Sequence, residues 1–363
     1  MRLVSFEVKT PLGLMRRIGA LAAREEPGDS SRIVDLTAGY SMLLREGGEP
    51  LWREIGEATM APDMVSFLKG GAGSRTRAQQ VLDFAAKAKA PDDDEAGQLV
   101  YARNEVKLLA PVPRPTTLHD FSVYQTHMTA HGRTEKLPQW YFFPPGYKGN
   151  PTAVYGPDDP MLWPDYTERL DPELEPAVYV CKTGRNISPE EAKDYIGGYT
   201  IFIDMSARDI HAREMFGPFK SKDFGSIMGP CMVTPDEFDE TNARCALRVN
   251  GETWWEGNTG ESRNFLLTDL VAYVSDGETL NPGDAIAAGT VGMSCSIDTD
   301  RWVKPGDVVE HWIEGIGTIR TTVQRESNPR THVRDGMTGR LPVPDAAKEW
   351  LTNLKQNAQL PGR

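Results

Sequence analysis

Short runs that alternate apolar and polar residues, separated by glycine, proline and aspartate turns, dominate the chain. Residues 243–257, ARCALRVNGETWWEG, alternate on both sides of Asn250-Gly251, which predicts a hairpin with a type I′ turn. Two Pro-Gly-Asp turns, at 282–284 and 305–307, each precede a strand-like run. Helical apolar spacing is limited to segments such as 76–90 and 264–277. The pattern predicts an α+β, β-rich fold, a β-roll or barrel with helices on its outside.

A proline-rich segment near residue 112 divides the chain into two predicted domains. The prolines of APVPRPTTLHD, residues 110–120, favour an extended connector, and an acidic loop lies shortly before it at 91–97. A chain of 363 residues is also longer than most single compact cores. We therefore expect a small N-terminal α/β domain at 1–112 and a larger C-terminal domain at 113–363.

Composition and charge narrow the class of partner. The hydrophobic share is 39% and the net charge is −12, which argues against a nucleic-acid footprint. No apolar run approaches the roughly 18 residues of a membrane span, and Glu7 and Lys9 interrupt any signal-peptide core. The four cysteines lie far apart without metal-type spacing. We expect a cytoplasmic protein that acts on a small molecule, without nucleic-acid or membrane partners.

Three carboxylates occupy alternate positions in RLDPELEPAVYV, residues 169–180: Asp171, Glu173 and Glu175. In a strand, alternate side chains point to one face, so these three acids share a face. The face is either the solvated side of an edge strand or, because apolar residues continue it, a buried face that a hard cation must neutralise. The stretch alone leaves both interpretations open.

Other candidate residues are individually ambiguous. Asp204 ends an apolar run before MSARDI, so it is either an N-cap or a carboxylate facing a cleft. Lys222 lies in a glycine- and phenylalanine-rich loop, where it is either surface charge or a contact for an anionic oxygen. Asp120 and His127 lie seven positions apart, a spacing that taken alone indicates a structural role.

The order of these motifs changes the interpretation. DFxxxxxH, LPxWxxxPxGYxG, DxELE, DxSARDI and KxFG follow one another over about a hundred residues, and together they closely resemble the fumarylacetoacetate hydrolase family across most of 105–325. The resemblance implies that the C-terminal domain has this family's β-roll, that the protein is a homodimer, and that its site holds a divalent cation. The following residues match the family's functional positions: Asp120, Glu173, Glu175 and Asp204 as metal ligands, His127 and Lys222 as catalytic residues, and Tyr147, Arg208, Ser226 and Thr290 as substrate contacts. His211 occupies a further substrate-contact position, at which the family usually has glutamine.

An all-carboxylate shell suits Mg²⁺, the expected ion, or Mn²⁺ or Ca²⁺, and disfavours zinc. The resemblance implies metal-dependent hydrolysis of a C–C bond in a β-diketone or acylpyruvate, as in the breakdown of aromatic compounds. The family's usual acid partners of the histidine are not matched, because their places fall at Ala130 and near Val308, although Glu310 shares that strand's face. Two alternatives therefore stay open: decarboxylation, isomerisation or hydration of a 2-oxo acid, and a catalytically inert binding protein.

Overall fold

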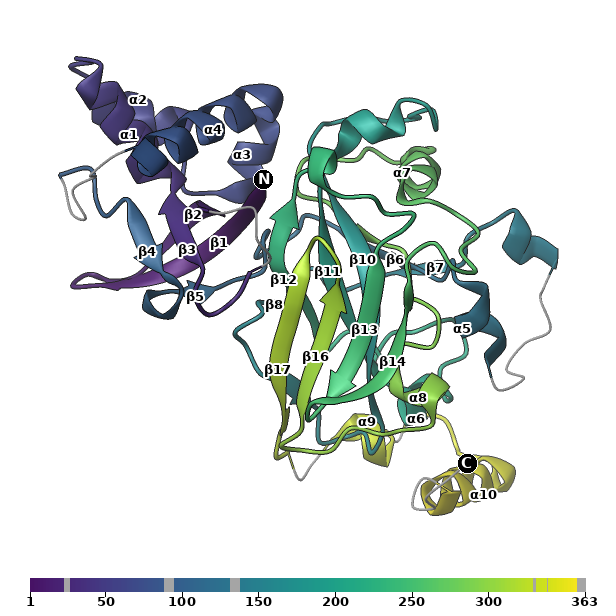
Figure 1. Ribbon diagram of the computed structural model, residues 1–363. Coiled ribbons are helices and arrows are strands. Elements are labelled where there is room, and N and C mark those ends of the chain that lie inside the picture. Colours follow the sequence, from purple (N-terminus) through teal and green to yellow (C-terminus); the bar gives the residue numbers. More distant parts are fainter. Residues whose placement is uncertain (23–26, 88–94, 131–137, 329–330, 338, 358–363) are drawn as a thin grey trace.

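Two β-sheets form the body of the protein (Figure 1). The computed structural model describes residues 1–22, 27–87, 95–130, 138–328, 331–337 and 339–357. The larger sheet has 12 strands, ten of them in the order β4-β3-β2-β1-β12-β11-β10-β15-β6-β7, while β5 pairs with β1 and β8 with β12. Its strands are β1 (Arg2–Thr10), β2 (Gly13–Leu21), β3 (Arg32–Asp35), β4 (Val100–Ala102), β5 (Lys107–Leu108), β6 (Leu118–Phe121), β7 (Gly146–Lys148), β8 (Val154–Tyr155), β10 (Leu170–Val180), β11 (Ile196–Ala207), β12 (Ser226–Val233) and β15 (Ala285–Ala287).

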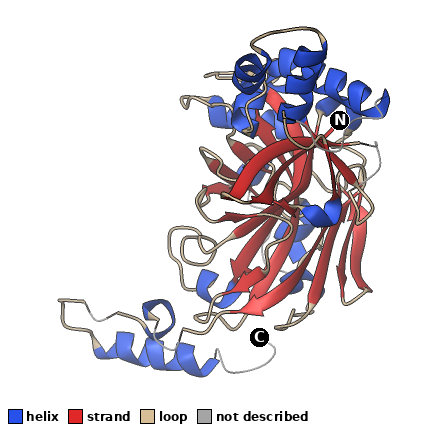
Figure 2. Ribbon diagram, turned by 90° about the vertical axis from the view of Figure 1, so that its left-hand side faces the viewer, coloured by secondary structure: helices blue, strands red, loops and turns tan. Residues whose placement is uncertain are grey.

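The second sheet has five strands in the order β14-β13-β16-β17-β9. They are β9 (Met161–Trp163), β13 (Arg244–Val249), β14 (Glu252–Asn258), β16 (Val308–Ile313) and β17 (Gly317–Arg325). One hydrophobic core contains side chains from both sheets, for example Leu174 and Ile203 from the first and Leu247 and Val309 from the second. Figure 2 shows the strands stacked below a cap of helices.

The helices lie outside the sheets. The N-terminal lobe, which Figure 1 draws in purple and blue, gathers α1 (Leu36–Glu46), α2 (Trp52–Thr59), α3 (Met64–Lys69) and α4 (Gly71–Lys87) beside β1 to β3. The remaining α-helices are α5 (Gln125–Thr129), α6 (Arg208–His211), α7 (Leu267–Ser275), α8 (Ser296–Thr299), α9 (His332–Asp335) and α10 (Asp345–Asn357), with 3₁₀ turns at Arg103–Glu105, Pro138–Tyr141, Ala192–Tyr195 and Pro235–Glu237. No helix among the described residues has the length and apolar character needed to cross a membrane.

The local elements that the sequence predicts are present. The hairpin of β13 and β14 turns at Asn250 and Gly251, whose φ values of 53° and 80° are those of a type I′ turn. The helical segment 264–277 contains α7, and 76–90 overlaps α4. The β-rich α+β fold class is confirmed. The domain boundary at 112 stays a prediction, since β1 of the N-terminal lobe pairs with β12 in one continuous sheet.

Strand β10 lies in the interior of the large sheet, between β11 and β15, and every residue in it is buried. Leu174 and Val178 face the core shared with the five-stranded sheet, whereas Ala177 and Tyr179 face a second core that includes residues of the N-terminal helices. Because both faces are covered, the acids of β10 are withdrawn from solvent, and the solvated edge-strand interpretation is wrong.

Candidate active site

Four acidic side chains gather near the centre of the large sheet. Glu173 lies directly opposite Asp204 in the β10–β11 ladder. Carboxylate oxygens of Asp120, Glu175 and Asp204 lie within 4.8 Å of one another, and all four acids are buried. Asp204 stands inside β11, three residues before Ala207, the N-cap of α6, so the interpretation of Asp204 as a helix cap is wrong.

The three clustered carboxylates repel one another in a buried place. Burial and the charge of Asp204 raise the pKa of Asp120 well above its ordinary value, and burial together with Asp120 does the same for Glu175. Among the described residues, Asp120 Oδ1 and Asp204 Oδ1 have no hydrogen-bonding partner. Buried acceptors of this kind are rare unless something compensates them. Three oxygen donors with two uncompensated atoms therefore fit a hard divalent cation.

Glu173 differs from the other three acids because cations and hydroxyl groups already surround it. Lys222 Nζ donates to Glu173 Oε2 at 2.6 Å, Ser206 Oγ donates to the same oxygen at 2.9 Å, and Thr290 Oγ1 donates to Oε1 at 2.8 Å. Arg208 Nη2 also donates to Oε1. Burial alone would raise the pKa of Glu173, but the charges of Arg208 and Lys222 outweigh it and hold the pKa well below the ordinary value. Glu173 is therefore ionised at neutral pH.

Lys222 and Tyr147 link the cluster to its surroundings. Lys222 Nζ also contacts Asp204 Oδ2, and Tyr147 Oη donates to that same oxygen at 2.9 Å. The ammonium group lies 5.3 Å from the centre of the Tyr147 ring. Burial would lower the pKa of Lys222, but Asp204 and Glu173 outweigh this and raise it, so the side chain stays charged. Asp120 faces Tyr147 directly in the β6–β7 ladder.

Two further predicted contacts, Ser226 and His211, lie at the margin of the cluster. Ser226 begins β12 opposite Asp204 in the ladder. His211 belongs to α6, and burial together with the charges of Lys222 and Arg208 lowers its pKa. A neutral His211 can both donate and accept a hydrogen bond at this margin.

Asp171, which the sequence leaves outside the metal ligands, joins two elements. Its Oδ2 accepts from Arg208 Nε at 2.6 Å, and its two oxygens accept from the backbone N–H of Ser296 at 2.5 Å and of Ile297 at 3.2 Å. These amides open α8, so Asp171 compensates N–H groups that the start of a helix leaves without acceptors. The carboxylate thereby connects β10 to the helix that carries Asp298.

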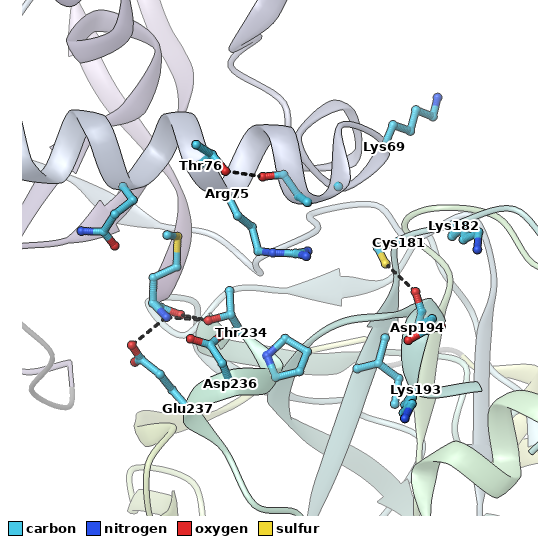
Figure 3. A pocket seen from close by; sticks show the side chains of 16 residues that line it. Lys69, Arg75, Thr76, Cys181, Lys182, Lys193, Asp194, Thr234, Asp236 and Glu237 are labelled. Carbon is cyan, nitrogen blue, oxygen red and sulfur yellow. Dashed lines mark hydrogen bonds and ion pairs between the residues drawn. The ribbon is translucent and has the colours of Figure 1, made fainter. Parts of the chain in front are cut away.

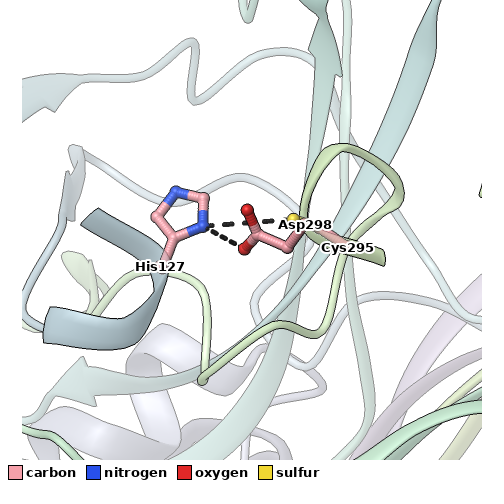
Figure 4. A group of neighbouring side chains, drawn as sticks. All are labelled: His127, Cys295 and Asp298. Atoms are coloured by element: carbon pink, nitrogen blue, oxygen red, sulfur yellow. Dashed lines mark hydrogen bonds and ion pairs between the residues drawn. The ribbon is translucent and has the colours of Figure 1, made fainter. Parts of the chain in front are cut away.

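His127 meets an acid that sequence reasoning missed. Its Nδ1 lies 2.6 Å from Oδ2 of the buried Asp298 (Figure 4). Its Nε2 lies 3.5 Å from Glu173 Oε1. Cys295 Sγ lies 4.0 Å from the same Nδ1. Because Asp298 accepts from Nδ1–H, Nε2 becomes the basic nitrogen of the neutral ring, on the side of the carboxylate cluster. The alternative partner, Glu310, instead accepts from Arg320 on the neighbouring strand β17.

The chain is similar to characterised proteins at the levels of sequence and fold. A sequence model described as fumarylacetoacetate (FAA) hydrolase C-terminal matches residues 116–324. The chain is 31% identical over 271 residues to oxaloacetate tautomerase YisK of Bacillus subtilis (strain 168), a match that covers 73% of this chain and 87% of the relative. It is likewise 31% identical over 271 residues to the mitochondrial oxaloacetate tautomerase FAHD2A of Homo sapiens, covering 72% and 80%.

A crystal structure of maleylpyruvate hydrolase from Sphingobium sp. SYK-6, in complex with manganese(II) and pyruvate, shares the fold. The TM-score is 0.63 at 23% sequence identity, and the similarity covers 90% of this chain and all of the hydrolase. The motif order, the sheet architecture and the sequence matches agree. The chain belongs to the fumarylacetoacetate hydrolase family.

Proposed function

We propose that this protein is a divalent-cation-dependent enzyme that interconverts the keto and enol forms of a small 2-oxo dicarboxylic acid such as oxaloacetate. The observation that carries the proposal is the 2.6 Å contact between His127 and Asp298 at the edge of the buried acidic cluster. The two relatives named oxaloacetate tautomerases, each matched over more than 70% of this chain, support the substrate class.

Asp120, Glu175 and Asp204 would hold the ion, with Glu173 as the fourth predicted ligand. Mg²⁺ is the expected ion, because all the donors are carboxylate oxygens, and Mn²⁺ or Ca²⁺ also suits such donors. When bound, the ion supplies Lewis-acid stabilisation of the negative charge on the enolate oxygen, a contribution of several kcal/mol.

His127 would move the proton. In tautomerisation a C–H bond beside the carbonyl breaks, its electron pair forms the C=C bond, and the carbonyl oxygen gains a proton. His127 Nε2 accepts a proton from one of these atoms and returns one to the other, while Asp298 fixes the ring through Nδ1 and stabilises the imidazolium that forms. General acid–base help of this kind contributes typically about 10²- to 10⁴-fold in rate.

The cations of the site suit a substrate with two carboxylate groups. Lys222 and Arg208 are both buried or nearly so. They offset part of the negative charge of the acids that they contact, and a bound divalent cation would offset more of it. Thr290 and Ser226 supply hydroxyl groups beside the acids. We assign these four residues to substrate binding, with Lys222 also next to the oxygen that develops negative charge.

Cleavage of a C–C bond by water is the second candidate. The His127–Asp298 pair favours it, because a partly buried base with a fixed proton position can also activate a water molecule. Hydrolysis yields two fragments, one with an oxygen from the solvent, whereas tautomerisation leaves the mass unchanged. Product analysis in ¹⁸O-labelled water separates the two, and released carbon dioxide would indicate decarboxylation instead.

The test follows the enol of oxaloacetate by its ultraviolet absorbance with purified protein and Mg²⁺. We expect the protein to accelerate ketonisation, EDTA to abolish the acceleration, and His127→Asn to slow it about 10²- to 10⁴-fold. His332→Asn, which changes an exposed histidine of α9, is the matched control and should keep full activity. No acceleration with any ion or substrate of this class would refute the proposal and favour an inert binding protein.

We also propose that the protein is a homodimer. This proposal is based on the family alone, and light scattering can test it.

A further inference from the structure

A cavity of about 920 Å³ lies between the N-terminal helices and one end of the large sheet (Figure 3). We call it the interlobe cavity. Lys69 at the end of α3 and Arg75 in the early part of α4 line its helical side. On the other side, Cys181 follows β10, Ile196 begins β11 and Thr234 follows β12. The cavity therefore adjoins three of the strands that form the acidic site.

The interlobe cavity is well separated from that acidic site. Cys181 is eight positions beyond Glu173 along β10, which corresponds to about 26 Å at about 3.3 Å per residue. Asp204 stands eight positions after Ile196 on β11, and Ser226 eight positions before Thr234 along β12. A ligand in the cavity would thus bind at the opposite ends of the strands, where the helical lobe meets the sheet.

Four cationic side chains from three segments line the interlobe cavity: Lys69, Arg75, Lys182 and Lys193. None of them forms an ion pair with an acid in the described part of the chain, and Lys182 lies over the Tyr195 ring at 4.8 Å. Figure 3 shows the Arg75 side chain extending into the space between α4 and the segment around Thr234. Cations gathered from several walls attract anions locally, even in a chain whose net charge is negative.

The acids around the interlobe cavity do not cancel this charge. Three acids line it, Asp194, Asp236 and Glu237, against the four cations. Glu237 is already compensated, because its Oε2 accepts from Arg2 Nη1 at 3.0 Å. Asp236 accepts a hydrogen bond from Thr234 and attracts Arg75, so Asp194 and Asp236 together face the four cations, and the local balance is positive.

The start of α4 adds a weaker contribution of the same sign. Gly71, with a φ of +52°, allows the tight connection from α3, and Gly71 and Ala72 line the cavity. First-turn N–H groups of a helix lack intrahelical acceptors, and the helix dipole favours negative charge there. These amides support the site that the side chains define.

We propose that the interlobe cavity binds a small polyanion, a phosphorylated or polycarboxylate metabolite with at least two negative charges. The volume is in the range of small-molecule sites, about 300–1,000 Å³. Arg75 can form paired hydrogen bonds with two oxygens of a phosphate or carboxylate group, and the lysines supply point charges. No aromatic side chain is among the described residues that line the cavity, so stacking of a nucleotide base is not part of the recognition.

The test measures binding of pyrophosphate and of citrate by isothermal titration calorimetry and thermal melting of the full chain. Metal ions are first removed from the protein with a chelating resin, so that neither probe is recruited by an ion in the acidic cluster and no free EDTA, itself a polycarboxylate, competes for the cavity. Acetate serves as the singly charged comparison. We expect pyrophosphate or citrate to bind and raise the melting temperature, with the tighter of the two identifying phosphate or carboxylate chemistry. Binding should weaken as ionic strength rises.

Variants locate the binding. Arg75→Glu and, from the opposite wall, Lys193→Glu should each weaken the affinity roughly ten-fold or more, since each replaces an attractive charge by a repulsive one. Lys304→Glu makes the same charge change at an exposed turn and should leave the affinity unchanged. Circular dichroism checks that each variant is folded. Absence of binding, or equal affinity in wild type and both cavity variants, would overturn the proposal without affecting the proposed enzymatic function.

Discussion

Replacing Asp298 by asparagine isolates the part that the carboxylate takes in orienting His127. The substitution keeps the size of the side chain but removes its charge at a contact of 2.6 Å, deep in the protein. A hydrogen bond to a charged group is worth about 1.5–3 kcal/mol. Because each 1.4 kcal/mol corresponds to a factor of ten, we expect the turnover rate to fall about 10- to 150-fold.

The expected loss should lie in turnover, because Asp298 is proposed to act through His127 and is not one of the three acids, Asp120, Glu175 and Asp204, that are proposed to hold the ion. Steady-state kinetics with the enol of oxaloacetate would give kcat and KM, and calorimetry would give the Mg²⁺ affinity, which should be unchanged. Asp300→Asn is the matched control: Asp300 is exposed and has a φ of 52°, a conformation that asparagine tolerates well.

A double-mutant cycle decides whether the two side chains work as a unit. If Asp298 acts only by orienting the ring, Asp298→Asn should cause little further loss in a protein that already carries His127→Asn. Fully additive losses would refute the coupling and show that Asp298 affects activity by another route, such as the packing of α8.

Three other substitutions should change the stability of the protein, and the direction of the change differs between them. His311 is fully buried and its pKa is lowered to about 4, so as the pH falls the unfolded chain takes up a proton before the folded protein does. The free energy of unfolding should therefore decline by about 3 kcal/mol between pH 6.5 and pH 4. In urea denaturation His311→Gln should make this decline with pH shallower, and an unchanged decline would contradict the role of His311. Glu175→Gln removes a repelling charge, so in EDTA the protein should gain about 1 kcal/mol of stability, roughly 2 °C in melting temperature, and it should lose the stabilisation that we expect from added Mg²⁺. A lower melting temperature in EDTA would count against the repulsion. Lys222→Met leaves Glu173 and Asp204 without their ammonium partner, so in EDTA the free energy of unfolding should fall by about 3 kcal/mol. Added Mg²⁺ should restore part of this stability. A loss that Mg²⁺ does not reduce would argue against an ion in the cluster.

Local patterns determined much of this protein. The alternation around Asn250-Gly251 predicted the β13–β14 hairpin, because turn type and side-chain alternation depend on neighbouring residues only. The spacing of Glu173 and Glu175 placed both carboxylates on one face of a strand for the same reason. Which family the chain belongs to was also readable, since the motifs that carry the resemblance are short and occur in a fixed order.

The burial of those motifs was decided by the tertiary structure. Nothing within residues 169–180 distinguishes an edge strand from a central one. The acids of β10 are withdrawn from water because both of its faces are covered, one by each hydrophobic core. Asp204 could not be separated from a helix cap by sequence, because both roles put a carboxylate after an apolar run. The register opposite Glu173 resolved this ambiguity.

The partner of His127 also could not be predicted from the local sequence. Asp298 lies 171 positions away, in a four-residue helix that Asp171 holds at its first turn, and no local signal marks it as a partner. The sequence by itself specified which chemical groups are available, namely oxygen donors, a histidine and cations. It also specified the strands that carry most of these groups. The tertiary structure alone decided which of these side chains are in contact. Contacts between distant segments depend on strand order and register across the whole fold, and short-range periodicity does not encode either of these.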